Sequence, residues 1–298
     1  MRALSFHTAL VVGLLLFPLA ASAAVTLPLP WKLGDKHRYQ SVSVLEKTRA
    51  GKTQRTETRE IDQVEIAEAN AKGFLQTWWA TSSSASLSGD GDNLAAEREL
   101  MQQLATRLRD LPMEAELAAN GSYLRLRNWK QLGAAMREVM LPAMVKQASL
   151  RPDLAKADLN ALRIRLAPML DKMTSEQAIG TTLGKNIAIF NFFTAASIPP
   201  DAPVTYEDYL PSPWSADLIP TKGSFRLAGR DDKAGTITIE WKQDIDPAKV
   251  AKGMRLSDYA TVLVDRRTGV PLRLDHRRRV EAGTSKTTST WRLVKLPN

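Results

Sequence analysis

The sequence predicts an α+β protein: a large antiparallel sheet, curved into a half-barrel or barrel-like form, with a helical section packed on it. Three observations lead to this prediction. Segments rich in Val, Ile, Thr and Trp recur towards both ends of the chain, an Asn-Gly pair separates two alternating segments, and apolar residues follow helical spacing through the middle. Because strand-like segments flank the helical ones, we expect a single domain over residues 24–298 with a helical insert at about 129–183.

Three strands are expected at the start of this domain. Residues 38–47, 54–66 and 73–87 are rich in β-branched and aromatic side chains, and Gly, Lys and Asn fill the gaps between them. The third segment carries apolar side chains on both faces, so we expect it to be covered on both sides. An amphipathic helix follows at 94–111, where Pro112 ends it.

The Asn120-Gly121 pair predicts a hairpin over residues 113–128, closed by a two-residue type I′ turn. A two-residue loop fixes the register of the two strands. The pairs that result join apolar with apolar and acid with base: Ala115–Leu126, Leu117–Leu124, Glu114–Arg127 and Glu116–Arg125.

Helical spacing predicts helices at 129–147, which Pro142 kinks or divides, and at 153–172. A capping box at 174–177 predicts the start of a third helix. The apolar run at 187–195 predicts a strand.

The stretch 199–220 holds six of the chain's sixteen prolines, which predicts a linker or a long connection. The last third of the chain alternates between apolar and polar residues and predicts a β-rich region, with a short helix opened by Asp246-Pro247. Its last three expected strands lie at 259–265, 270–282 and 286–296.

The first 23 residues predict a secretory signal peptide that is cleaved near Ala23. A charged start leads into an apolar run, and small residues follow. We therefore expect a periplasmic or secreted protein with no transmembrane segment after cleavage. Export makes ATP, nicotinamide cofactors and nucleic acid poor candidates as partners. The absence of Cys excludes disulfides, thiolate nucleophiles and Cys-ligated zinc.

The chain is basic, with a formal net charge of +9. From Val262 onward, nine Lys or Arg residues stand against three Asp or Glu residues. In an exported protein such a surface fits anionic lipid headgroups, lipopolysaccharide or acidic glycans. A solvated face that keeps the protein soluble explains the same charges.

Five residues are candidates for ligand binding. On the strand expected at 270–282, His276 and Arg278 interrupt the apolar face, so we expect both side chains to point inward. A buried guanidinium needs a partner, which an anionic headgroup or a neighbouring carboxylate supplies. The pattern needs no such partner if the strand runs past the edge of the core or contains a β-bulge. Met136, Met140 and Met144 stack on one helix face and fit either an adaptable apolar surface or ordinary core.

The sequence singles out no catalytic residue, metal site or cofactor. Residues 180–186 are one residue short of a phosphate-binding loop and lack its Ser or Thr. Asp90, Asp92 and Asn93 lack the later ligands of a calcium loop. There is no Gly-x-Ser-x-Gly motif, and no pair of carboxylates stands out for glycoside hydrolysis.

The order of these features resembles exported bacterial proteins that carry a domain of unknown function. A signal precedes long strands, the Asn120-Gly121 hairpin precedes a helical section, and a Leu210-Pro211 loop precedes the segment 220–225 and a turn at 265–269. The strand content also resembles Lol-type lipoprotein carriers, in which a curved antiparallel half-barrel holds acyl chains under helices.

The resemblance assigns no functional residue, and the first hypothesis from the residues themselves is a non-enzymatic binder of an apolar or acylated ligand. The inner sheet face and the Met-bearing helices then form the pocket, and Arg278 meets the anionic end, so an anionic lipid or another envelope component is the expected partner. An envelope hydrolase that uses carboxylates and an envelope scaffold without a small ligand are the alternatives.

Overall fold

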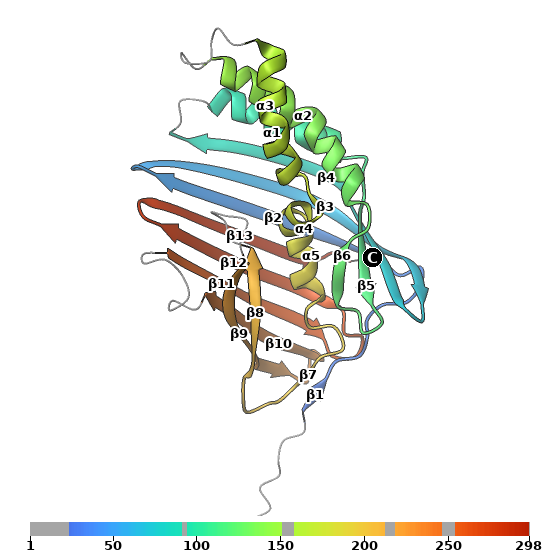
Figure 1. Ribbon diagram of the computed structural model, residues 1–298. Coiled ribbons are helices and arrows are strands. Elements are labelled where there is room, and N and C mark those ends of the chain that lie inside the picture. The colour runs from blue at the N-terminus through green and yellow to red at the C-terminus, as the bar shows by residue number, and fades with distance from the viewer. Residues whose placement is uncertain (1–23, 91–93, 151–157, 212–217, 246–253, 298) are drawn as a thin grey trace, which may run out of the picture.

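The computed structural model describes residues 24–90, 94–150, 158–211, 218–245 and 254–297. Its largest element is an eleven-stranded antiparallel sheet, and Figure 1 shows the helices gathered over one face of it. The strands of this sheet are β2 (Lys36–Arg49), β3 (Lys52–Asn70), β4 (Gly73–Gly89), β5 (Met113–Ala118), β6 (Tyr123–Leu126), β8 (Val204–Pro211), β9 (Leu218–Asp231), β10 (Thr236–Ile245), β11 (Met254–Asp265), β12 (Pro271–Ala282) and β13 (Ser285–Lys295).

Strands from the two ends of the chain meet in the middle of the sheet. The order is β6-β5-β4-β3-β2-β13-β12-β11-β10-β9-β8, and β2 pairs with β13, with Ser41 opposite Leu293. This arrangement confirms the α+β class. The strands β6 and β8 form opposite edges, so the sheet is open as described and the predicted barrel-like form is not confirmed. The short strands β1 (Val25–Thr26) and β7 (Ser197–Ile198) pair separately.

In the described part of the chain one helix follows β4, and four more lie between β6 and β7. No described helix is long and apolar enough to cross a membrane. Helix α2 runs through Pro142 without dividing. The expected turn of helix at Asp246-Pro247 and the first residues of the one expected at 153–172 lie outside the described residues. The helices are α1 (Leu94–Leu108), α2 (Trp129–Ser149), α3 (Leu159–Met173), α4 (Glu176–Thr182) and α5 (Gly184–Asn191).

The apolar run at 187–195 forms most of helix α5, so the strand predicted there is wrong. Ile187, Ile189 and Phe190 are all buried. A helix buried on most sides has no polar face, and a short apolar run then looks the same in sequence as a buried strand. The third helix predicted from 174–177 forms as α4, but its N-cap is Ser175, whose side chain accepts a hydrogen bond from the Ala178 amide. Because alanine stands at that third position, the reciprocal bond of a capping box is not made.

The predicted hairpin forms, but its loop is longer than two residues. Ala115 lies opposite Leu126 as expected, whereas a register shift places Leu117 opposite Tyr123. The Ala118 amide donates to the Ser122 carbonyl across three intervening residues. A three-residue loop with glycine in the left-handed region is a common hairpin solution, and Gly121 has a φ of 82°. The shift leaves Leu124 exposed.

The proline-rich stretch 199–220 is not a bare connection. It contains β8, which pairs with β9 so that Val204 lies opposite Phe225. Because β8 is an edge strand, one side of its backbone makes no sheet hydrogen bonds, and prolines are tolerated there. The expected linker is therefore wrong for its described part.

We call the helix-covered side of the sheet its inner face and the opposite side its outer face. Helix α5 crosses the inner face: Phe190 meets Tyr39 of β2 and Trp78 of β4 edge-on, with ring centroids 5.3 and 4.9 Å apart. These three rings belong to the main hydrophobic core. Burial of rings of this size contributes on the order of 2–3 kcal/mol each, so this contact fixes α5 on the sheet.

Candidate functional site

A group of polar side chains interrupts the inner face where the apolar core ends on β11 and β12. In the register of these strands Asp258 lies opposite Arg278, and on its other side Asp258 lies opposite Gln243 of β10. Side chains that lie opposite each other in a sheet share a face. Helix α5 brings Lys185 to the same place from above. We call Lys185, Asp258, His276 and Arg278 the basic cluster.

The carboxylate of Asp258 is the centre of the basic cluster. Its Oδ1 atom lies 3.3 Å from Lys185 Nζ and 3.0 Å from His276 Nε2. Its Oδ2 atom lies 3.9 Å from Arg278 Nη1, which is an ion pair but too long for a hydrogen bond. The Asp258 side chain is fully buried, whereas Lys185 and Arg278 are 20% and 14% exposed. The two cations thus separate the carboxylate from solvent.

The charges of the basic cluster follow from burial and from each other. Burial alone raises the pKa of Asp258, but the hydrogen bond with His276 and the charges of Lys185 and Arg278 hold it below its usual value. Burial lowers the pKa of Lys185 to about 8, against the attraction of Asp258. Burial also lowers the pKa of His276, so its imidazole is neutral at pH 7.

The basic cluster therefore holds two cations and one anion at neutral pH. Within the described residues, Asp258 Oδ2 accepts no hydrogen bond. The next carboxylate on this face is the exposed Asp208 of β8, whose Oδ2 accepts a hydrogen bond of 3.3 Å from Gln243. Asp208 is not among the charges that shift the pKa of Lys185. A partly buried excess of positive charge is an arrangement that attracts an anion.

Aromatic side chains border the basic cluster on the side of β10. The Trp241 ring lies 6.3 Å from the His276 ring, centroid to centroid, and the Trp241 indole donates to the Tyr206 hydroxyl. Gln243 also donates to the Thr221 hydroxyl at 2.8 Å. These hydrogen bonds hold the wall beside the cluster in place.

A second polar group on the inner face, on β3, has the opposite character. Burial raises the pKa of Asp62 to about 7, and the neighbouring Glu60 adds to the shift while the Ser41 hydroxyl opposes it. Glu60 accepts a hydrogen bond of 2.9 Å from the Ser83 hydroxyl. Glu60 and Asp62 are two residues apart on one strand, so their side chains share a face. We call them the acidic pair.

The structure brings two of the five predicted site residues together. His276 and Arg278 both point inward as the alternation predicted, and both meet Asp258. The methionines lie elsewhere: Met136 packs against the main core, and Met140 and Met144 are half-buried on α2. Helix α2 packs mainly on α1, α3 and α4 rather than on the sheet.

Sequence reasoning missed Lys185 and Asp258. Asp258 alternates with Leu256 and Ala260 on the apolar face of β11, and that signal was readable. Starting the expected strand at residue 259 placed Asp258 outside it. Lys185 stood only in the incomplete phosphate-binding motif at 180–186, and its partner Asp258 lies 73 residues away in sequence.

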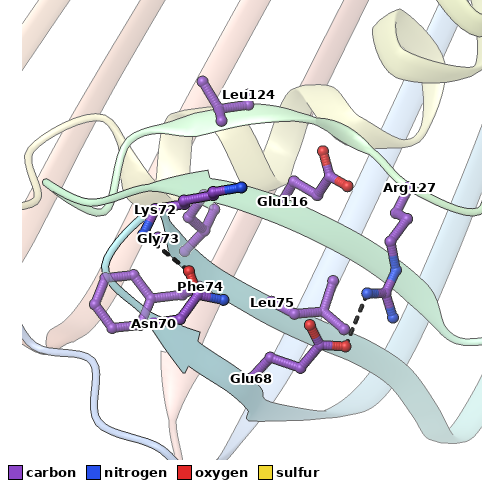
Figure 2. Close-up of a pocket in the computed structure, with 10 residues that line it drawn as sticks. Glu68, Asn70, Lys72, Gly73, Phe74, Leu75, Glu116, Leu124 and Arg127 are labelled. Carbon is purple, nitrogen blue, oxygen red and sulfur yellow. Dashed lines mark hydrogen bonds and ion pairs between the residues drawn. The ribbon is translucent and has the colours of Figure 1, made fainter.

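A hollow with a volume of about 250 Å³ lies at the tips of β3 to β6. Figure 2 shows Leu75 at its base, with Glu68 and Arg127 joined by an ion pair at the rim. Arg125 pairs in the same way with Glu116. Because these charges compensate one another within the protein, this hollow offers an ionic ligand less than the basic cluster does.

Comparisons with known proteins give no family. No family model and no curated protein matches this chain. A solved structure described as lipid–protein interactions in lipovitellin is similar to it with a TM-score of 0.46 and 10% sequence identity. That similarity covers 89% of this chain and 25% of the other, so the present chain spans about a quarter of the length of that chain.

Proposed function

We propose that this protein is an exported, non-enzymatic binder of an anionic amphiphile, such as an acidic lipid, with a role like that of Lol-type carriers. In this proposal residues 1–23 are the cleaved signal, and the basic cluster receives the anionic group. The observation that carries the proposal is the unequal charge around Asp258: Lys185 and Arg278 share one carboxylate.

The energetics of this arrangement favour a role in binding over one in stability. A buried charge without its own partner costs several kcal/mol, and natural proteins retain such sites where function needs them. The lowered pKa of Lys185 expresses that cost, since burial opposes its charged form. An anion placed between Lys185 and Arg278 neutralises the excess charge, and its charge-assisted hydrogen bonds contribute about 1.5–3 kcal/mol each.

A second, small apolar cluster lies next to the basic cluster on the same strands. Beyond Asp258 and Gln243 the inner face becomes apolar again at Leu256 and Ile245. The partly buried Met254 and Val280 pack against this second apolar cluster. A ligand whose anionic end lies at the basic cluster has its apolar part within reach of these side chains, which is why we propose an amphiphile rather than a small inorganic anion.

Native mass spectrometry of the mature protein from its own source, followed by lipid extraction, tests the proposal. We expect a co-purifying anionic lipid at one-to-one stoichiometry. Arg278→Ala should lose it, and Arg279→Ala is the matched control, because that exposed residue is next in sequence and lies on the outer face. A mass without ligand, or equal loss in both variants, contradicts the proposal.

The acidic pair supports a second candidate function, which is carboxylate-based hydrolysis. General acid catalysis needs a carboxyl that keeps its proton near neutral pH beside one that is ionised. Burial and Glu60 give Asp62 this property. Release of reducing ends from a panel of envelope glycans, absent in Asp62→Asn, is the result this candidate requires. No release by the folded wild-type protein eliminates it.

A further inference from the structure

The outer face of the sheet carries a hollow that the proposed function does not use. It has a volume of about 510 Å³ and crosses the middle of the sheet from β11 to β3. Its floor is made of short side chains, namely Val42, Val44 and Thr290, and longer side chains rise around them. The hollow therefore results from residue size on otherwise regular strands. We call it the outer hollow.

Three arginines line the outer hollow, and one of them has no ion-pair partner among the described residues. Arg59 pairs with Glu57 at 2.7 Å, and Arg292 pairs with Asp275 at 2.6 Å. Arg277, which is exposed and lines the hollow, makes no hydrogen bond or ion pair within the described ranges of the chain.

The two carboxylates at the outer hollow are already shared. Glu57 also accepts a hydrogen bond from Arg55, and Asp275 also accepts one from Arg273. The hydrogen bonds from these arginines keep the pKa of Glu57 low, and for Asp275 they outweigh burial, so both carboxylates are ionised at neutral pH. Because each carboxylate already compensates two guanidinium groups, neither is available to Arg277.

The shape of the outer hollow fits a linear ligand. In the strand register Tyr259, Arg277, Thr290 and Val44 lie side by side on neighbouring strands. Five strands at about 4.8 Å spacing give a length of about 19 Å across the strands. Tyr259 is 43% exposed and presents its ring at one end. An exposed aromatic ring packs well against the C–H face of a sugar ring, and a guanidinium pairs with a carboxylate in a bidentate manner.

We propose that the outer hollow binds a short segment of an acidic polysaccharide that bears carboxylate groups. In this complex one sugar ring lies on Tyr259, and the carboxylates meet Arg277 and Arg292. A bilayer surface fits less well, because membrane contact requires apolar side chains that protrude and these lie at the bottom of a hollow. A nucleic acid strand fits less well, because a single aromatic ring offers one stacking position.

Isothermal titration of the full chain with a short oligogalacturonate tests this proposal. A neutral malto-oligosaccharide of the same length and an oligothymidylate of the same charge serve as comparison ligands. We expect the uronate to bind, with Arg277→Ser weakening it at least about tenfold. Tyr259→Ser should weaken it about threefold.

Arg38→Ser is the matched control, because Arg38 is also exposed, makes no side-chain contact within the described ranges and lies on the outer face outside the hollow. It removes the same charge and should weaken binding less than about twofold. Three results overturn the proposal: no binding of the uronate by folded wild-type protein, equal losses in Arg277→Ser and Arg38→Ser, or tighter binding of the oligothymidylate. Far-ultraviolet circular dichroism of each variant verifies that it is folded.

Discussion

The inner face of the sheet holds two polar groups of opposite character, the basic cluster on β11 and β12 and the acidic pair on β3. In the basic cluster two cations surround Asp258, and its pKa is lowered. In the acidic pair Asp62 faces another carboxylate and a hydroxyl, and its pKa is raised to about 7. Both are buried aspartates on one sheet, so burial alone does not decide the charge of either. The partners that α5 and the adjacent strands bring decide it.

Replacement of the central carboxylate in the basic cluster should have the largest effect. Asp258→Asn leaves Lys185 and Arg278 facing each other without an anion, and we expect the free energy of unfolding to fall by about 3 kcal/mol or more. Urea denaturation at pH 7 measures this change. A loss below about 1 kcal/mol contradicts this account, because it means that Lys185 and Arg278 do not depend on Asp258.

The same substitution in the acidic pair should act in the opposite direction. Because the folded-state pKa of Asp62 is about 7 and its ordinary value is 3.8, the folded state holds a proton that the unfolded state has lost between these values. Wild-type stability should therefore fall as the pH rises from about 4 to about 7. Asp62→Asn carries no such charge and should be more stable than wild type by about 2–4 kcal/mol above pH 7.

The stability difference for Asp62→Asn should shrink as the pH falls and vanish near pH 4. Urea denaturation curves at several pH values for both proteins measure it. A difference that does not change with pH shows that the effect comes from packing. That result contradicts the raised pKa of Asp62.

Removal of one cation tests whether the basic cluster carries an excess of positive charge. Lys185→Met leaves one guanidinium and one carboxylate, and we expect the unliganded protein to gain about 1–3 kcal/mol at pH 7. Since the folded-state pKa of Lys185 is about 8 and the ordinary value is 10.5, wild-type stability should rise between these pH values. Thermal unfolding of both proteins at pH 7 and pH 10 should show the gap closing at the higher pH.

The sequence predicted those parts of the molecule in which local pattern and tertiary contact agree. Alternation identified most of the long strands but not β8, and it placed His276 and Arg278 on the inner face. The strand predicted at 187–195 failed because a buried apolar run looks alike in a helix and in a strand. The basic cluster could not be predicted, because Asp258 reaches His276 from a neighbouring strand and Lys185 reaches Asp258 from a helix 73 residues away in sequence. A site assembled from distant segments depends on topology, which local pattern does not contain.

The most direct test of the proposed binding site is the affinity for an anionic lysolipid, measured by isothermal titration below its critical micelle concentration. Lysophosphatidylglycerol should bind wild type at one-to-one stoichiometry and at least about tenfold more tightly than zwitterionic lysophosphatidylcholine. Lys185→Met should lose that preference although it is the more stable protein. Equal affinity for the two lipids, or an unchanged preference in Lys185→Met, contradicts the assignment of the basic cluster as the site that receives the anionic group.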